Sequence, residues 1–292
     1  MWRLAGHAPA KNEQKKLESR LRAAFFFEAL LPSPMSLRLL ARLAAAATPL
    51  LLAGCAGLSP EPPAPQALDQ SAWARASSVP PLTQAEPPAA WEFLLLPGKS
   101  PVRFASTRHH GRVALAADAD AAASGVRRRL RVEPPDLGRL RFSWFVPELI
   151  ATADLGHREA DDSPVRIVLA FEGDRSKLSP RDRMLSELAR ALTGEELPYA
   201  TLMYVWCNQR PAGSVIPNPR TDRIRKFVVE SGGPRLNRWL DYERDIRADF
   251  ERAFGEPPGA LVAIGVMTDT DNTRTATRAW YGPLHLVAAR RR

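Results

Sequence analysis

The densest cluster of polar side chains in this sequence is segment 268–273, Thr-Asp-Thr-Asp-Asn-Thr, which directly follows an apolar run. Asp269, Asp271 and Asn272 place two carboxylates and an amide close together, and Ca²⁺ prefers oxygen ligands of this kind. The EF-hand loop is a poor match, because its glycine and its closing glutamate are missing. Three interpretations therefore stay open: a turn or buried hydrogen-bond network, a structural calcium site, and a catalytic site.

A second acidic group lies in the loop before a predicted strand at 164–171. It contains Asp154, Glu159, Asp161 and Asp162. If this loop meets segment 268–273, a carboxylate pair for general acid–base chemistry or glycoside hydrolysis becomes conceivable. Acidic loops at strand ends are usually only solvated, so catalysis is an alternative and not the leading interpretation.

Aromatic residues on predicted strands could offer ring faces to a sugar. Large aromatics that alternate along a strand are more often part of the core, which is what we expect of Trp144. We expect Trp206 or Trp280 to be exposed, and in a regular strand one of Trp280 and Tyr281 must point outward. The candidate ligand-binding residues are Asp161, Asp162, Tyr204, Trp206, Asp269, Asp271, Asn272 and Trp280.

Other signatures of chemistry are weak. His109 and His110 are adjacent, so on a strand they face opposite sides and cannot readily share one metal ion. The sequence has no phosphate-binding loop, no nucleophile elbow and no metal-binding cysteine pair. We expect no cofactor beyond the possible structural calcium, and a binding protein more readily than an enzyme.

The elements that must position these residues are mostly strands. Alternation of period two runs through the chain after residue 90, and 261–267 is apolar on both sides, as a central strand is. Many short strands with Gly, Pro and Asp between them predict an all-β dominated fold, a β-sandwich of jelly-roll, galactose-binding-like or lectin-like type. Strands are predicted at 91–96, 101–107, 111–117, 125–132, 140–146, 164–171, 202–207, 223–230, 261–267 and 278–288.

Two short helical insertions are predicted within the sandwich. Ser179 and Pro180 form a helix start and Gly194 closes the segment, with leucines along one stripe. The second helix is predicted from about Asp241 to Phe254, where large apolar residues recur every four positions. We expect both helices to pack against the sheets.

The start of the chain predicts export and lipidation. Residues 35–54 have basic residues followed by a Leu- and Ala-rich run, the pattern of a secretory signal peptide. The apolar run is shorter than the about 20 residues of a spanning helix. The tetrapeptide at 52–55 resembles the lipobox of bacterial lipoproteins, which implies lipid on Cys55. Residues 1–34 fit no signal and are interpreted as an extension before the true start.

A proline-rich tether is predicted over 55–90, followed by a single β-sandwich domain over 91–292. Eight prolines and few large apolar residues between 56 and 90 argue against a folded segment. Lipidation of Cys55 would leave Cys207 alone, so no intrachain disulfide is expected. Ala56 stands where Asp would signal inner-membrane retention, so by resemblance to that sorting pattern the outer membrane is favoured.

The charge balance argues against nucleic acid as a partner. The net charge is +9 over the whole chain. Residues 1–54 hold eight Lys and Arg and three Asp and Glu, so their removal leaves 33 basic and 29 acidic residues, or +4. A mildly basic surface beside anionic lipid or polysaccharide is ordinary.

Several motifs occur in order across the C-terminal two-thirds: Asp161-Asp162 before 165–168, then 201–206, 218–221, 245–250, 268–273 and 281–284. Over about residues 91–288 they resemble an uncharacterised bacterial exported family, domain of unknown function 3047. The resemblance implies an exported β-rich domain with no established activity and assigns no catalytic residue. The strand order also resembles jelly-roll sandwiches that bind carbohydrate.

We therefore expect a cell-envelope lipoprotein, held at the membrane by lipidated Cys55, whose β-sandwich binds a glycan or another ligand without catalysis. A shallow aromatic groove would support this prediction. The first alternative is an envelope hydrolase that uses carboxylates of loops 154–162 and 269–272. The second is a scaffold subunit of an envelope complex, for which a large exposed apolar patch is the sign.

Overall fold

The computed structural model of the chain describes residues 66–79, 89–287 and 289. Contacts divide the chain into two units, residues 1–59 and 60–292, and every described residue belongs to the second. The predicted extension 1–34, the signal peptide 35–54 and Cys55 therefore lie outside the described residues. Among the helices that are described, none has the length and apolarity needed to span a membrane.

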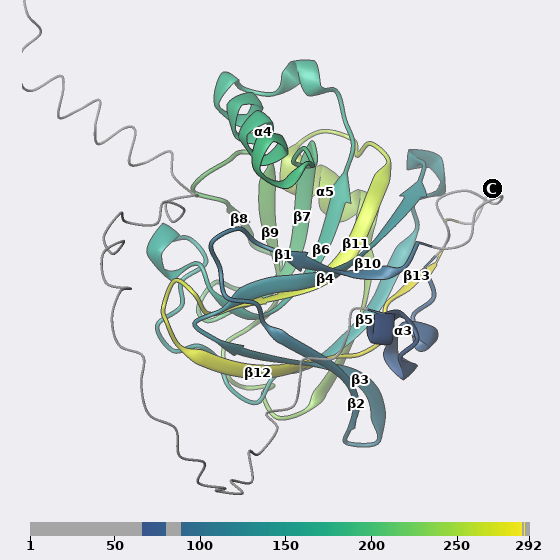
Figure 1. Ribbon diagram of the computed structural model, residues 1–292, viewed down its shortest axis with the longest axis vertical. Coiled ribbons are helices and arrows are strands. Elements are labelled where there is room, and N and C mark those ends of the chain that lie inside the picture. The colour runs from purple at the N-terminus through teal and green to yellow at the C-terminus, as the bar shows by residue number, and fades with distance from the viewer. Residues whose placement is uncertain (1–65, 80–88, 288, 290–292) are drawn as a thin grey trace, which may run out of the picture. The chain divides into compact units, whose positions relative to one another are not determined.

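The second unit is a β-sandwich, which confirms the predicted fold class (Figure 1). Neighbouring strands in the described part pair antiparallel, except for one parallel pair, Ala200–Cys207 with Ile224–Ser231. The seven-stranded sheet has the order β1 (Trp91–Leu95), β4 (Ala123–Val132), β11 (Leu261–Asp269), β6 (Ser163–Phe171), β7 (Ala200–Cys207), β9 (Ile224–Ser231) and β8 (Val215–Pro217).

The six-stranded sheet supplies the other layer. Its inner face presents Phe142 and Trp144 to the core, where their rings contact Tyr204 and Trp206 of the first sheet. Its order is β10 (Trp239–Asp245), β5 (Arg139–Phe145), β12 (Ala276–Tyr281), β3 (Arg112–Asp120) and β2 (Arg103–His109), with β13 (His285–Val287) also paired to β5.

Both predicted helical insertions exist, and one begins later than predicted. α5 spans Ile246–Phe254, because Asp245 caps its start and the preceding residues 239–245 form β10 on β5. The prediction of a helix from Asp241 is wrong over these first residues. The spacing of Tyr242 and Ile246 looked helical, whereas Tyr242 lies on a strand and contacts Trp144.

α4 spans Pro180–Thr193, with the predicted cap at Ser179 and Gly194 at its left-handed end. Its apolar stripe faces solvent, contrary to our expectation that it packs on a sheet. The buried side is small and polar instead, with Asp182 accepting from Thr221 and Ser186 accepting from Arg175. These polar contacts orient the helix and leave Leu188 and Leu192 exposed.

Part of the predicted tether is folded onto the sandwich. Residues 66–79 contain α2 (Gln66–Asp69) and α3 (Ala72–Ala76). Trp73 is fully buried, packs its ring against Trp91 at 4.7 Å and donates its indole N–H to the Gly282 carbonyl at 3.0 Å. The folded unit therefore begins before Trp91, because this single large side chain provides apolar surface to bury. Residues 55–65 and 80–88 lie outside the described residues.

Candidate functional site

The two predicted acidic loops meet at one end of the sandwich. β6 and β11 are antiparallel neighbours with Ser163 opposite Asp269, so the start of one strand adjoins the end of the other. One carboxylate oxygen from each of Asp162, Asp269 and Asp271 lies within 4.8 Å of the others. The two loops therefore meet, as the hydrolase alternative required.

Asp162 ties the second loop to the first. Its carboxylate accepts hydrogen bonds from the Thr273 backbone N–H at 2.7 Å, the Thr273 hydroxyl at 2.6 Å and the Asn272 backbone N–H at 3.2 Å. Asn272 therefore contributes its backbone to this site. Three donors on one buried carboxylate fix the path of the loop between β11 and β12.

Two buried cations, Arg166 and Lys226, neutralise the remaining carboxylates. Arg166, 2% exposed, donates to Asp161 at 3.0 Å and reaches both oxygens of Asp269 at 3.0–3.1 Å. Lys226, 0% exposed, donates to Asp161 and to the Leu155 carbonyl. With the ion pair between Lys99 and Asp271, these form the carboxylate network: Asp161, Asp162, Asp269, Asp271, Lys99, Arg166 and Lys226.

Neither buried cation was predicted from the sequence. Arg166 and Lys226 alternate with apolar neighbours, a pattern that is typical of the solvated face of a strand. Loop 154–162 instead lies against this side of the sheet, where Lys226 donates to the Leu155 carbonyl and Arg166 to the Asp161 carbonyl, so both side chains are buried. The number of carboxylates in the two loops could have indicated buried cations, because buried carboxylates need cationic partners.

The network contains two groups that titrate near neutral pH. Burial raises the pKa of Asp269 to about 7, against the opposing effect of Arg166, and the neighbouring Asp161 and Asp162 raise it further. Burial lowers the pKa of Lys226 to about 8, while Asp161 opposes that shift. Asp269 could therefore hold a proton at neutral pH, although its oxygens already face Arg166 and the Ser163 N–H.

The donor set of the network does not suit calcium. Asp162 already accepts three protein hydrogen bonds, Asp269 is paired with Arg166, and Asp271 is paired with Lys99. The positive charge that an ion would bring is thus present in the protein's own side chains. Calcium binding remains an untested prediction that this arrangement disfavours.

Tyr204 and Trp206 lie in the core, so their prediction as ligand contacts is wrong. Tyr204 is 0% exposed and donates its hydroxyl to Asp249 at 2.9 Å. Trp206 is 1% exposed and donates its indole N–H to the Gly232 carbonyl at 2.9 Å. Both side chains are on the inner face of β7, where the six-stranded sheet covers them. Trp144 of that sheet is buried against Trp206, as predicted for a core residue.

Trp280 points outward from the six-stranded sheet, while Tyr281 is fully buried. Phe145 of β5 lies directly opposite Trp280 on one side and Trp239 of β10 on the other. His109, at the end of β2, stacks on Trp280 with 3.8 Å between ring centroids and 7° between planes. These four side chains, His109, Phe145, Trp239 and Trp280, form what we call the aromatic surface.

Charged groups border the aromatic surface. The guanidinium of Arg112 lies 5.5 Å from the Trp239 ring centroid and pairs with Asp241 at 2.7 Å. Arg278 lies 5.2 Å from the Trp280 centroid and pairs with Asp118 at 3.0 Å. Burial lowers the pKa of His109, and the nearby cations act in the same direction. A neutral imidazole therefore stacks on Trp280 at physiological pH.

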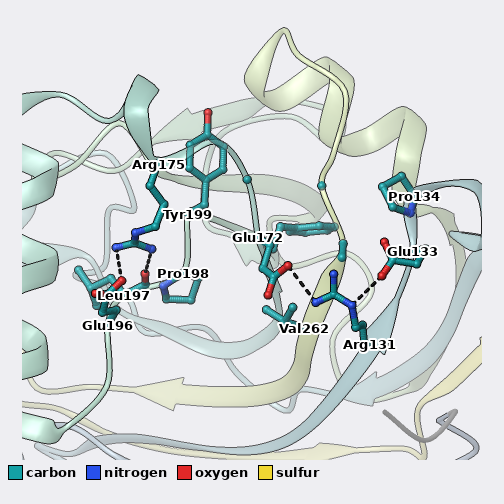
Figure 2. Close-up of a pocket in the computed structure, with 14 residues that line it drawn as sticks. Arg131, Glu133, Pro134, Glu172, Arg175, Glu196, Leu197, Pro198, Tyr199 and Val262 are labelled. Atoms are coloured by element: carbon teal, nitrogen blue, oxygen red, sulfur yellow. Dashed lines mark hydrogen bonds and ion pairs between the residues drawn. The ribbon is translucent and has the colours of Figure 1, made fainter. Parts of the chain in front are cut away.

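A pocket of about 550 Å³ lies at the other end of β6 and β11, near Phe171 and Leu261 (Figure 2). Arg131 donates there to Glu133 at 2.6 Å and to Glu172 at 2.9 Å. Arg175 pairs with Glu196 at 2.9 Å. The lining residues are Arg131, Glu133, Pro134, Phe171, Glu172, Gly173, Arg175, Glu196, Leu197, Pro198, Tyr199, Gly259, Ala260 and Val262, and none of them is a predicted site residue.

Comparison with known proteins gives a family match and structural likenesses. The xyloglucanase domain of NopAA, a type three effector from Sinorhizobium fredii solved in complex with cellobiose, is similar over 69% of this chain and 94% of its own, with 10% identity and a TM-score of 0.35. Comparison with curated proteins gives no match. The profile of one family, described as a protein of unknown function (DUF3047), matches residues 89–285, as the sequence motifs indicated. Since this match spans well over half of the sequence, the chain belongs to the DUF3047 family.

Proposed function

We propose that the protein is a lipid-anchored component of the cell envelope that binds a glycan without catalysis. The aromatic surface is the proposed contact site. The observation that supports this proposal is the row formed by Trp239, Phe145 and Trp280 on the open face of the six-stranded sheet. Trp239 and Trp280 are partly exposed and offer apolar faces and edges to the apolar sides of sugar rings, while Phe145 lies buried between them.

The spacing of the two tryptophans favours an extended ligand. Trp239 and Trp280 are on strands two positions apart in the sheet, so their backbones are separated by roughly 10 Å. A short oligosaccharide bridges such a distance, whereas a single sugar ring contacts one tryptophan at a time.

The aromatic surface is also held in place before a ligand arrives. The Trp239 indole N–H donates to the His109 carbonyl at 3.1 Å, and the Phe145 ring contacts Trp239 and Trp280 edge-on. Side chains that are already ordered lose little entropy on binding, which favours affinity.

Retention on a polysaccharide array tests the proposal. The purified protein, residues 56–292, should be retained on at least one envelope glycan, and Trp239→Ala and Trp280→Ala should each weaken retention roughly thirtyfold, or about 2 kcal/mol. Leu95→Ala is the matched control, because Leu95 is exposed on β1 of the other sheet. Thermal unfolding of each variant verifies folding. Retention that survives both tryptophan substitutions would exclude the aromatic surface.

A hydrolase is the second candidate, favoured by the convergence of Asp162, Asp269 and Asp271. The enzyme would release new reducing ends from a retained glycan, and Asp269→Asn would abolish release but keep retention. We expect no release from the wild-type protein, because the carboxylates of the network are buried and paired within the protein.

A further inference from the structure

We infer that Lys226 and Asp161 become covalently joined in the folded protein, through an isopeptide bond between the lysine amine and the side-chain carboxyl group. Nζ of Lys226 lies 2.5 Å from Oδ2 of Asp161. A carbon–oxygen bond is about 1.2 Å long, so Nζ lies within about 4 Å of the Asp161 Cγ atom. This separation is close to the distance from which an amine attacks a carbonyl carbon.

Burial makes the Lys226 amine a nucleophile. Lys226 is 0% exposed and Asp161 is 5% exposed, so the protein interior surrounds both groups. Burial lowers the pKa of Lys226 to about 8 and the Arg166 cation acts in the same direction, although the Asp161 carboxylate opposes the shift. A fraction of the amine is therefore neutral near neutral pH, and the neutral amine is the form that attacks.

Arg166 prepares the carboxyl group for this attack. Its Nη2 atom donates to Oδ1 of Asp161 at 3.0 Å and to the Asp161 backbone carbonyl at 2.8 Å. A donor held at Oδ1 stabilises the negative charge that develops on this oxygen when Cγ is attacked. Arg166 is also paired with Asp269, so it keeps an anionic partner when the Asp161 charge is lost.

The reaction is a condensation that needs no further reagent. One proton of the Lys226 ammonium group passes along the hydrogen bond to Oδ2 of Asp161. The neutral amine then forms the Nζ–Cγ bond, while the electron pair of the carbonyl bond moves onto Oδ1. When a second proton passes from Nζ to Oδ2, the carbonyl bond re-forms, the Cγ–Oδ2 bond breaks and Oδ2 leaves as water with the electron pair of that bond.

The surroundings of the pair suit the amide product. The hydrogen that stays on Nζ can donate to the Leu155 carbonyl, which lies 2.6 Å from Nζ in the ion pair. Oδ1 of Asp161 keeps its hydrogen bond from Arg166. Two buried charges, whose desolvation is costly, are replaced by one neutral amide. The bond would tie loop 154–162 to β9, and it requires no part of the aromatic surface.

Tryptic peptide mapping of the full chain tests the inference. The linked protein should yield peptide 159–166 joined to peptide 226–235, lighter than the sum of the two by one water. Without the bond, trypsin also cleaves after Lys226 and releases free peptides 159–166 and 227–235. Lys226→Arg keeps the positive charge but has no amine to condense, so it should release peptide 159–166 unlinked.

Lys99→Arg is the matched control, because Lys99 is the lysine that pairs with Asp271 in the same network. The linked peptide should persist in this variant. Free peptides 159–166 and 227–235 from the wild-type protein, without the linked species, would overturn the inference whether or not the variants fold. Loss of water confined to peptide 159–166 would also overturn it, since that result indicates a cyclic imide, and so would fragmentation that places the link on Glu159 or Asp162.

Discussion

Lys226 and Arg166 are the residues on which the carboxylate network depends. Together they place two positive charges among buried carboxylates, and Lys226 shares Asp161 with Arg166. If a buried cation is replaced by a neutral residue, its carboxylate partner stays charged in the protein interior without a counter-charge, which is energetically costly. The network should therefore act as a structural clamp between the two loops.

Substitution of Lys226 tests this role. Lys226→Met should lower the free energy of unfolding in urea by about 3–5 kcal/mol, because Asp161 loses a buried partner. Adding Asp161→Asn should recover part of that loss, since the unpaired charge is removed. The control is Arg139→Met, which breaks an exposed pair with Glu243 and should cost less than about 1 kcal/mol. Equal losses at both sites would contradict the clamp.

The raised pKa of Asp269 predicts a pH dependence. Its folded-state pKa of about 7 lies above the unfolded value of about 3.9, so the folded protein holds this proton more tightly. The contribution of Asp269 to the free energy of unfolding is therefore fully present below pH ~4 and is lost as the pH rises through about 7. Asp269→Asn should therefore be most destabilising near pH 4 and less so near pH 8. A difference in unfolding free energy that grows with pH would contradict this assignment.

At the scale of elements, local sequence patterns predicted the strands. They failed where a strand is buried on both sides, or where packing against a distant segment decides the structure. Alternation in 140–146 is a local property, so β5 was predictable. Trp239 was missed because no strand was predicted at this point and the spacing from Tyr242 to Ile246 looked helical, although residues 239–245 pair with β5. The convergence of the Asp162 and Asp269 loops depends on the β6–β11 pairing, which no single segment encodes.

The N-terminal helices provide a prediction at the same scale. Trp73→Ala should lower the free energy of unfolding by about 3–5 kcal/mol, because it removes a fully buried ring and its hydrogen bond to Gly282. Urea unfolding measures this loss. Arg75→Ala, on the exposed side of α3, is the control and should change stability by less than about 0.5 kcal/mol. An unchanged stability of Trp73→Ala would mean that residues 66–79 behave as a tether.

At the scale of the whole molecule, the sandwich presents the aromatic surface, and the proposed lipid anchor would hold it at a membrane. Anchoring is testable without knowledge of the ligand. In cells grown with radiolabelled palmitate, the wild-type protein should carry label and Cys55→Ser should not, because thioether and amide attachment both require that cysteine. Label on Cys55→Ser, or none on the wild type, would contradict lipidation.

The place where a glycan lies on the sandwich tests the proposed role of the aromatic surface. Oxidative footprinting of the protein with a retained glycan should protect Trp239 and Trp280, while Met184 on α4 keeps reacting and serves as the internal control. Protection is expected because the ligand covers the partly exposed rings of the aromatic surface. Unchanged oxidation of both tryptophans with the glycan bound, or protection confined to the pocket around Tyr199, would contradict the account.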